Sequence, residues 1–147
     1  MTTEERMELG AKYKREMNCC QAVVKAMADT VDADEATLHR LGGGFGSGMG
    51  TMEGTCGALV GAIMIASLRA SGVSRPSAVS AIAPAVSPAT ATGEAMKLSR
   101  QILPRFRELC GATICRELKG VGTGKVLCSC EDCVRNAIRA AEDALGQ

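Results

Sequence analysis

Apolar and polar positions follow a helical period through most of the chain. Near the N-terminus the apolar positions recur every three or four residues and form one stripe, which consists of Leu9, Tyr13, Met17, Cys20, Val24, Met27 and Val31. This spacing predicts a long amphipathic helix over residues 3–30, with a break near Asn18 as the alternative. Cys20 lies on the stripe and is expected to be buried by packing, whereas Cys19 lies about 100° around the helix and is free to point elsewhere.

A short second helix is predicted over residues 32–41. Asp32 is a suitable N-cap, because its carboxylate can accept a hydrogen bond from an amide of the first turn. Leu38 and Leu41 are expected to face inward. Gly42 can end the helix in the left-handed conformation, which glycine adopts without steric cost.

The rest of the chain predicts further helices. Their ranges are residues 51 or 55 to 71, 74–83, 94–109, 113–118 and 130–145, and the last presents an apolar face of Val134, Ala137, Ile138, Ala141 and Leu145. Pro104 is expected either to kink its helix or to start a new one. Pro84 and Pro88 indicate a turn, and residues 89–94 predict a loop. We therefore expect an all-α fold over residues 1–147, a single cysteine-rich domain built as a compact bundle of five or six helices with a glycine-rich loop before the central helix.

The predicted central helix follows a stretch that is dense in glycine. Nine of the twenty residues from 42 to 61 are glycine, which implies unusual backbone angles, close backbone approach, or both. One side of the helix carries almost no side chains, because it is made of Gly54, Gly57, Ala58, Gly61 and Ala62. Another helix, a bulky ligand or a second subunit of a homodimer can approach this side closely. Cys56 lies at or near the first turn, where unpaired amides and the helix dipole favour a thiolate.

Composition narrows the class of protein. Hydrophobic residues make up 46% of the chain and aromatic residues only 2%, which favours a helix-on-helix core over a β-sandwich. The net charge of +1 argues against nucleic acid and anionic membranes as partners. The first residues do not resemble a signal peptide, and the longest apolar run, Gly54–Leu68, has 15 residues, fewer than the ~20 that span a bilayer. We expect a cytoplasmic protein without membrane insertion.

Eight cysteines are the main chemical feature of the chain. In a reducing compartment they predict metal ligands, redox thiols or buried packing in place of a disulfide framework. The most compact group is Cys128, Cys130 and Cys133, whose spacings are typical of metal-ligand runs; buried cysteines without chemistry are the alternative. The glycine loop could also hold phosphate, but the chain has no GxxxxGK[ST] sequence, which argues against a nucleotide site.

Several short segments together resemble a known family. They are Asn18–Val23, Gly42–Gly44, Cys56–Gly61 and Cys115–Leu118, followed by a cysteine shortly before Val134 and a final helix. Over nearly its whole length, the chain resembles the putative redox-active proteins named for their C_GCAxxG_C_C cysteine pattern. The resemblance implies redox activity and four defining cysteines. These fall on Cys19, Cys56, Cys115 and either Cys130 or Cys133, which leaves Cys20, Cys110 and Cys128 as additional cysteines of this chain.

Three functions remain open on these grounds. In the first, Cys19, Cys56, Cys115 and either Cys130 or Cys133 hold an iron–sulfur cluster for electron transfer with a redox partner protein; Gly57 and Gly61 leave room for it, and zinc is the alternative metal. In the second, Cys56 exchanges disulfides without a cofactor, and Cys19 or Cys115 resolves them. In the third, the protein is a helical interaction module without chemistry. Whether the protein is an enzyme stays open.

Overall fold

The computed structural model describes residues 1–72 and 87–146, and it confirms the all-α prediction. Within these ranges the chain forms seven α-helices: α1 (Thr3–Tyr13), α2 (Cys19–Met27), α3 (Glu35–Leu41), α4 (Gly57–Ala70), α5 (Pro88–Cys110), α6 (Cys115–Lys119) and α7 (Cys130–Gly146). The count exceeds the predicted five or six, since the predicted N-terminal helix is divided in two. The β-structure in these ranges is limited to isolated bridge residues, among them the antiparallel bridge between Thr55 and Ile114. Every helix in them is too short or too polar to cross a bilayer.

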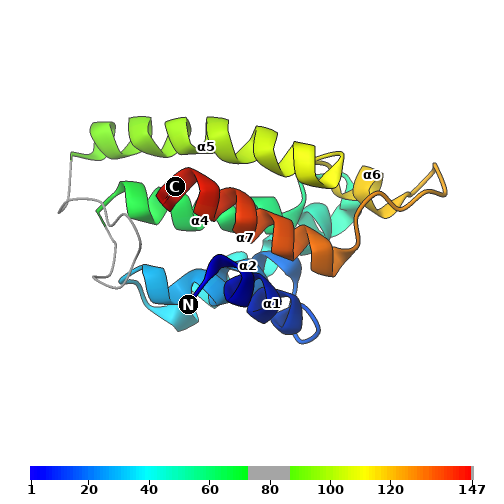
Figure 1. Ribbon diagram of the computed structural model, residues 1–147, viewed down its shortest axis with the longest axis horizontal. Helices are drawn as coiled ribbons and strands as arrows, with labels where there is room; N and C mark the ends of the chain where they lie inside the picture. The colour runs from blue at the N-terminus through cyan, green and yellow to red at the C-terminus, as the bar shows by residue number, and fades with distance from the viewer. Residues whose placement is uncertain (73–86, 147) are drawn as a thin grey trace.

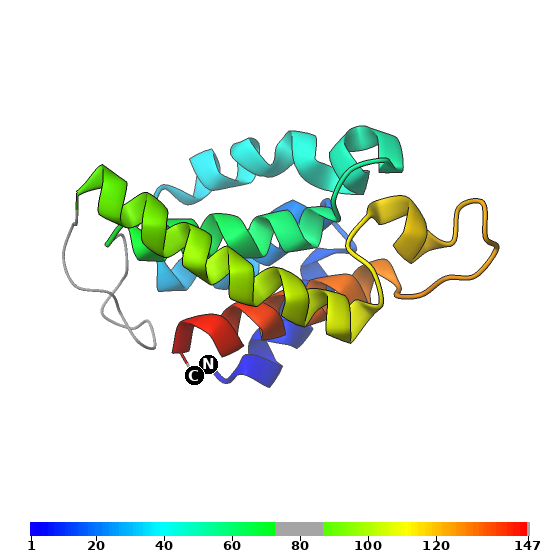
Figure 2. The same ribbon diagram turned by 90° about the horizontal axis from the view of Figure 1, so that it is seen from above.

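The helices are arranged in three layers (Figure 1). α4 and α7 lie side by side in the middle, α5 covers one side of them, and α1 and α2 cover the other. The core between the layers is mainly aliphatic, with Leu59, Ile65, Ile102 and Ile138 fully buried beside the ring of Phe106. Helices α4 and α7 both begin at the end of the bundle that carries α6, as the view from above also shows (Figure 2).

The break between α1 and α2 is set by a capping box at Asn18. The Asn18 side chain accepts a hydrogen bond from the Gln21 amide (2.9 Å), and the Gln21 side chain accepts one from the Asn18 amide (3.2 Å). These two bonds satisfy amides that a helix start leaves unpaired. The alternative of a break near Asn18 is therefore confirmed, and Cys19 becomes the first residue of α2. The side-chain nitrogen Nδ2 of Asn18 also donates to the carbonyls of Gly42 and Gly43 (both 3.2 Å), which ties α2 to the glycine-rich loop.

Three details predicted for α3 are wrong. Asp34 caps this helix in place of Asp32, because the Asp34 carboxylate accepts from the Thr37 amide at 2.8 Å. Leu38 is buried as predicted, but Leu41 is 57% exposed. Gly42 has φ −75°, so it is not left-handed. The reason is that the chain continues directly from α3 into a short 3₁₀ turn.

Helix α4 begins later than predicted, at Gly57, with Cys56 in the N-cap position. Its side without side chains faces α2. A Cβ atom at Gly57 would lie 2.4 Å from the Phe45 carbonyl oxygen and 2.7 Å from the Cys19 sulfur, and one at Gly61 would lie 2.8 Å from the Cys20 carbonyl oxygen. The glycines therefore serve close packing inside the chain. At these two positions α2 and the loop occupy the space in which a ligand or a second subunit was predicted to approach.

Helix α5 replaces a predicted loop and turn. Residues 89–94 are helical, because the Ser87 hydroxyl caps the helix by accepting from the Thr90 amide (3.2 Å) and Pro88 occupies the first turn, where its missing N–H costs nothing. Pro104 lies inside the helix and does not start a new one. The helix predicted over residues 74–83, and Pro84, lie outside the described residues.

Helices α1 and α7 are joined by a buried ion pair. The Arg6 guanidinium nitrogen Nε lies 2.9 Å from the Glu142 carboxylate, and their side chains are only 6% and 8% exposed. Arg6 also pairs with Asp29 and donates to the Ala26 carbonyl oxygen at 2.6 Å. The apolar face predicted for α7 is buried in full; it consists of Val134, Ala137, Ile138, Ala141 and Leu145.

Candidate functional site

All eight cysteines lie in the described residues, and each carries a free thiol. Cys20 stands apart from the others. It is fully buried, with its sulfur 3.7 Å from the Met64 sulfur, so it packs between α2 and α4 as the apolar stripe predicted. Burial raises the pKa of Cys20 to about 12, with the nearby charge of Cys56 adding to the effect. Cys20 therefore stays a protonated, hydrophobic side chain.

Five of the other cysteines surround one small cavity, of about 60 Å³. We call it the five-cysteine pocket; its described lining consists of Cys19, Cys56, Cys115, Cys130 and Cys133 with Lys14, Asn18, Ser47 and Lys119. These cysteines come from α2, α4, α6 and α7, and they include every cysteine that the family resemblance suggested for a shared site. Gly57 and Gly61 are not among the lining residues, since both face α2.

The starts of three long helices direct positive charge at the pocket. Cys19 is the first residue of α2, Cys56 is the N-cap of α4, and Cys130 is the first residue of α7. Amides at a helix start have no partner inside the helix, and the helix dipole adds a partial positive charge there. An anion such as a thiolate is therefore stabilised at each of these positions.

Cys56 is the thiol most easily ionised in this pocket. Hydrogen bonds from the Cys133 and Cys19 thiols, with further ones from the amides of Ala58 and Leu59, lower the pKa of Cys56 far below its ordinary value, although burial opposes them. The same contact with Cys56, together with burial, raises the pKa of Cys19. Cys56 therefore carries the negative charge, and Cys19 keeps its proton and donates it to that charge.

Lys119 supplies a positive charge beside the pocket. Its ammonium group donates a hydrogen bond to the Cys130 sulfur. Burial alone would lower the pKa of Lys119, but the contact with the Cys130 sulfur and the charge of Cys56 raise it above its ordinary value. Lys119 therefore stays protonated and offsets negative charge that gathers on the sulfurs.

The glycine-rich loop holds Cys56 and Cys115 next to each other. The Cys56 amide donates to the Thr113 carbonyl at 2.8 Å, and the Cys115 amide donates to the Gly54 carbonyl at 3.0 Å. At Gly48, which has φ +57°, a Cβ atom would lie 2.5 Å from the Cys115 Cβ. Glycine is required there both for the left-handed backbone and for this close approach. The loop is thus a support for the cysteines, and it brings no lining residue other than Ser47.

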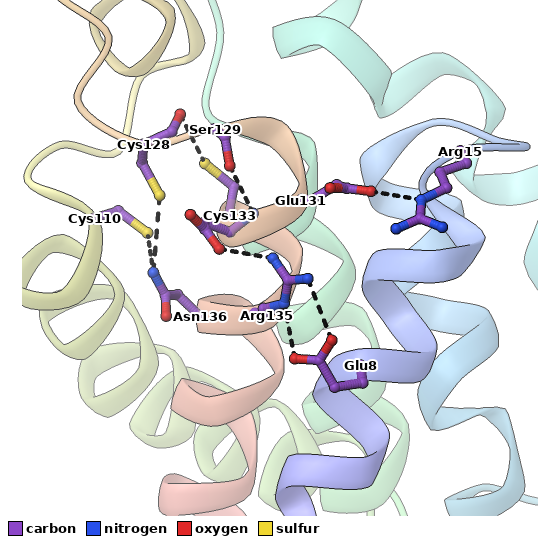
Figure 3. A network of polar contacts seen from close by, with 10 residues as sticks. Glu8, Arg15, Cys110, Cys128, Ser129, Glu131, Cys133, Arg135 and Asn136 are labelled. Carbon is purple, nitrogen blue, oxygen red and sulfur yellow. Dashed lines mark hydrogen bonds and ion pairs between the residues drawn. The ribbon is translucent and has the colours of Figure 1, made fainter.

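A second group of cysteines adjoins the pocket. The sulfurs of Cys110, Cys128 and Cys133 all lie within 4.8 Å of one another, and all three residues are buried. The Asn136 side chain donates to the Cys110 and Cys128 sulfurs, at 3.4 and 3.8 Å (Figure 3). We call this group the three-cysteine cluster; it shares Cys133 with the five-cysteine pocket.

Sequence reasoning missed Cys110 as a member of a site. It placed Cys128 in a run typical of metal ligands, but left Cys128 out of the four-cysteine site that the family resemblance implied. Cys110 ends α5, and no spacing along the chain links it to α7. The sequence contains a weak indication that Asn136 lies at the three-cysteine cluster, because Asn136 lies three residues after Cys133 on α7 and therefore on the same helix face as Cys133.

The fold and these two groups of thiols define a small all-α, cysteine-rich protein with a buried sulfur centre that could hold a metal. A comparison with family models identifies the family within this class. Residues 17–144 match the family described as "Putative redox-active protein (C_GCAxxG_C_C)", and the chain belongs to this family. No curated protein and no solved structure matches the chain.

Proposed function

We propose that the protein transfers electrons through an iron–sulfur cluster bound in the five-cysteine pocket by Cys19, Cys56, Cys115 and Cys130. The observation that carries this proposal is the convergence of thiols from α2, α4, α6 and α7 on one cavity. Clusters of this kind are held by four thiolates, which the protein must supply in deprotonated form. Cys130 is chosen over Cys133 because Cys133 also belongs to the three-cysteine cluster.

The chemistry of the pocket fits such a group. The lining offers sulfur ligands, three helix starts that stabilise negative charge, and the ammonium groups of Lys14 and Lys119. The cavity is small, which favours a [2Fe–2S] unit over a larger cluster. The four proposed ligand sulfurs all belong to described residues, and no three of them lie within 4.8 Å of one another, so a single zinc ion would require them to move closer together. When bound, an iron–sulfur cluster supplies one-electron oxidation and reduction. The Cys133 thiol, within hydrogen-bonding reach of the Cys56 sulfur, would then tune the potential.

The test is anaerobic purification followed by reconstitution with iron and sulfide. Iron, sulfide and zinc are quantified, and the visible absorption spectrum is recorded in both redox states. Cys19→Ser and Cys115→Ser should each abolish stable cluster binding, whereas Cys20→Ser, far from the pocket, should retain it. A protein that stays colourless and free of iron while fully helical would refute the proposal. Stoichiometric zinc would show that the pocket holds a structural metal ion and not a cluster.

A second candidate function, thiol–disulfide exchange, is favoured by the contact between Cys19 and the easily ionised Cys56. The Cys56 thiolate would attack a disulfide of a redox partner protein and form a mixed disulfide, releasing one partner thiolate. Cys19, after losing its proton, would attack the Cys56 sulfur and release the second. The partner gains two electrons, and the chain is left with a Cys19–Cys56 disulfide.

Alkylation of the metal-free, reduced protein tests this second candidate. Iodoacetamide should modify Cys56 far faster than Cys20, as read by peptide mass spectrometry. Mild oxidation should join Cys19 to Cys56. Uniformly slow modification of all eight thiols would rule it out.

A further inference from the structure

The three-cysteine cluster is built from elements that are remote in sequence. Cys110 is the last residue of α5, Cys128 lies in the loop before α7, and Cys133 lies in the first turns of α7. Their sulfurs lie within 4.8 Å of one another, and the residues are 4%, 8% and 0% exposed. This is the spacing of ligands around one ion, in a place that water does not reach.

Asn136 shows that the cluster is more than apolar packing. Its amide nitrogen donates toward two of the three sulfurs, at 3.4 and 3.8 Å (Figure 3). A donor aimed at sulfur stabilises a thiolate, and groups that orient metal ligands act in this way. The Cys133 sulfur also lies 3.8 Å from the Cys128 carbonyl oxygen, which fixes its position.

We infer that the three-cysteine cluster is a second metal site, which adjoins the five-cysteine pocket and shares Cys133 with it, for a soft ion that accepts three sulfur ligands, Cu(I) being the ion of this class. Among the described residues, no fourth His, Cys, Asp or Glu ligand atom joins the group. Structural zinc sites almost always take four ligands, whereas soft sulfur donors select Cu(I). Each thiol that ligates the ion releases its proton to solvent, and the ion keeps its oxidation state. The Asn136 donor and the start of α7 offset the negative charge that results.

This assignment separates the cysteines into two sets. Cys110, Cys128 and Cys133 would hold the soft ion, and Cys19, Cys56, Cys115 and Cys130 remain for the pocket. Neither Cys110 nor Cys128 lines the pocket. Cys133 faces both sites, so an ion in the cluster would remove the Cys133 thiol as a donor to Cys56. The four proposed pocket ligands and the three cluster ligands are nevertheless different residues, so the two proposals are tested with different variants.

The test is titration of the reduced, metal-free protein with Cu(I) under ascorbate, in competition with bicinchoninate. Wild-type protein should bind one equivalent of Cu(I) tightly. Cys110→Ser and Cys128→Ser should each weaken the Cu(I) affinity by more than ~100-fold. Asn136→Ala removes only a supporting donor and should weaken the affinity roughly tenfold. Cys20→Ser, Cys19→Ser and Cys115→Ser should keep wild-type affinity. Circular dichroism checks that each variant is folded.

Two results would overturn the inference. One is unchanged Cu(I) affinity in folded Cys110→Ser and Cys128→Ser, and the other is a loss that follows Cys19→Ser and Cys115→Ser instead. If the cluster variants fail to fold, X-ray absorption of the copper-loaded wild-type protein decides: three sulfur ligands support the site, and two or four exclude it.

Discussion

Cys133 of α7 and Cys56 at the start of α4 line the same pocket, and the Cys133 thiol interacts with the Cys56 sulfur. This contact joins the five-cysteine pocket to the three-cysteine cluster. It lowers the pKa of Cys56 more than any other single contact. The pKa of Cys133 is raised mainly by its contacts with Cys110 and Cys128, and the contact with Cys56 adds to the effect. The proton is therefore held on Cys133 and the charge on Cys56.

Replacing Cys133 by Ala should make the reactivity of Cys56 depend on pH. In the wild-type protein the pKa of Cys56 lies far below its ordinary value, so its thiolate is fully formed and alkylation is independent of pH between about 6 and 8. In Cys133→Ala the pKa rises toward the ordinary ~8.5, and the rate should climb with pH through the same range. Rates are measured by mass spectrometry with iodoacetamide. Identical pH profiles for the two proteins would show that Cys133 does not control Cys56.

The reduced, metal-free protein should lose stability at alkaline pH, in part through Cys20. The pKa of Cys20 is raised to about 12 in the folded state, so above the ordinary thiol pKa the unfolded chain releases a proton that the folded chain keeps. The stabilisation is complete below that ordinary pKa and is lost as pH rises through the folded value. At about pH 9.5 the loss is about 1.4 kcal/mol for this one thiol. Urea unfolding at two pH values should show a smaller decline for Cys20→Ala, and an equal decline would contradict the assignment.

Gly57→Ala should destabilise the protein by about 1–3 kcal/mol, because its Cβ would overlap the Phe45 carbonyl oxygen and crowd the Cys19 sulfur. Gly93→Ala is the matched control. Gly93 lies in α5, and no atom of the described residues lies within 4 Å of the added Cβ, so this change should stabilise by about 0.5–1 kcal/mol. Both are read from urea unfolding of the reduced protein. Equal effects of the two changes would mean that α2 and α4 are not packed this closely.

Arg6→Met should cost about 3–5 kcal/mol of stability, because it removes the cation in contact with the buried Glu142 carboxylate and leaves Arg69 as the buried cation that acts on it. Arg139→Met is the control on α7. Arg139 pairs with Glu4, whose side chain is 70% exposed, and a pair in contact with water contributes below about 1 kcal/mol. The free energies of unfolding of the two variants should therefore differ clearly. Similar small losses would indicate that the Arg6 pair is as hydrated as the surface pair.

Lys119→Met should lower the reduction potential of a metal centre in the five-cysteine pocket. The Lys119 ammonium contacts the Cys130 sulfur, and a cation near a cluster favours the reduced, more negative state. Lys119→Arg keeps the charge and should hold the potential close to the wild-type value, as should Lys97→Met on the exposed part of α5. Redox titration followed by absorption measures the shift. A rise in potential, or no change, would show that this charge does not act on the centre.

The local pattern of apolar and polar residues was enough to predict the fold class and the burial of several side chains. The helical period assigned Cys20 to the buried stripe and Cys19 to a different face, and it predicted the buried face of α7 from Val134 to Leu145. Periodicity succeeds there because the spacing of apolar residues within a helix determines which face the helix buries. It failed at helix ends, as at Asp34 and residues 89–94, because capping depends on side-chain contacts that compete over a few residues.

The sequence by itself determined an all-α chain whose eight cysteines match a redox-active family, with Cys19, Cys56 and Cys115 as candidates for one site. Only the tertiary structure decided which helix ends meet. It placed Cys110, at the end of α5, against the start of α7, and it turned Gly57 and Gly61 toward α2. The physical reason is that contacts between remote elements follow from packing the whole core at once, since no single segment carries the information about its neighbours.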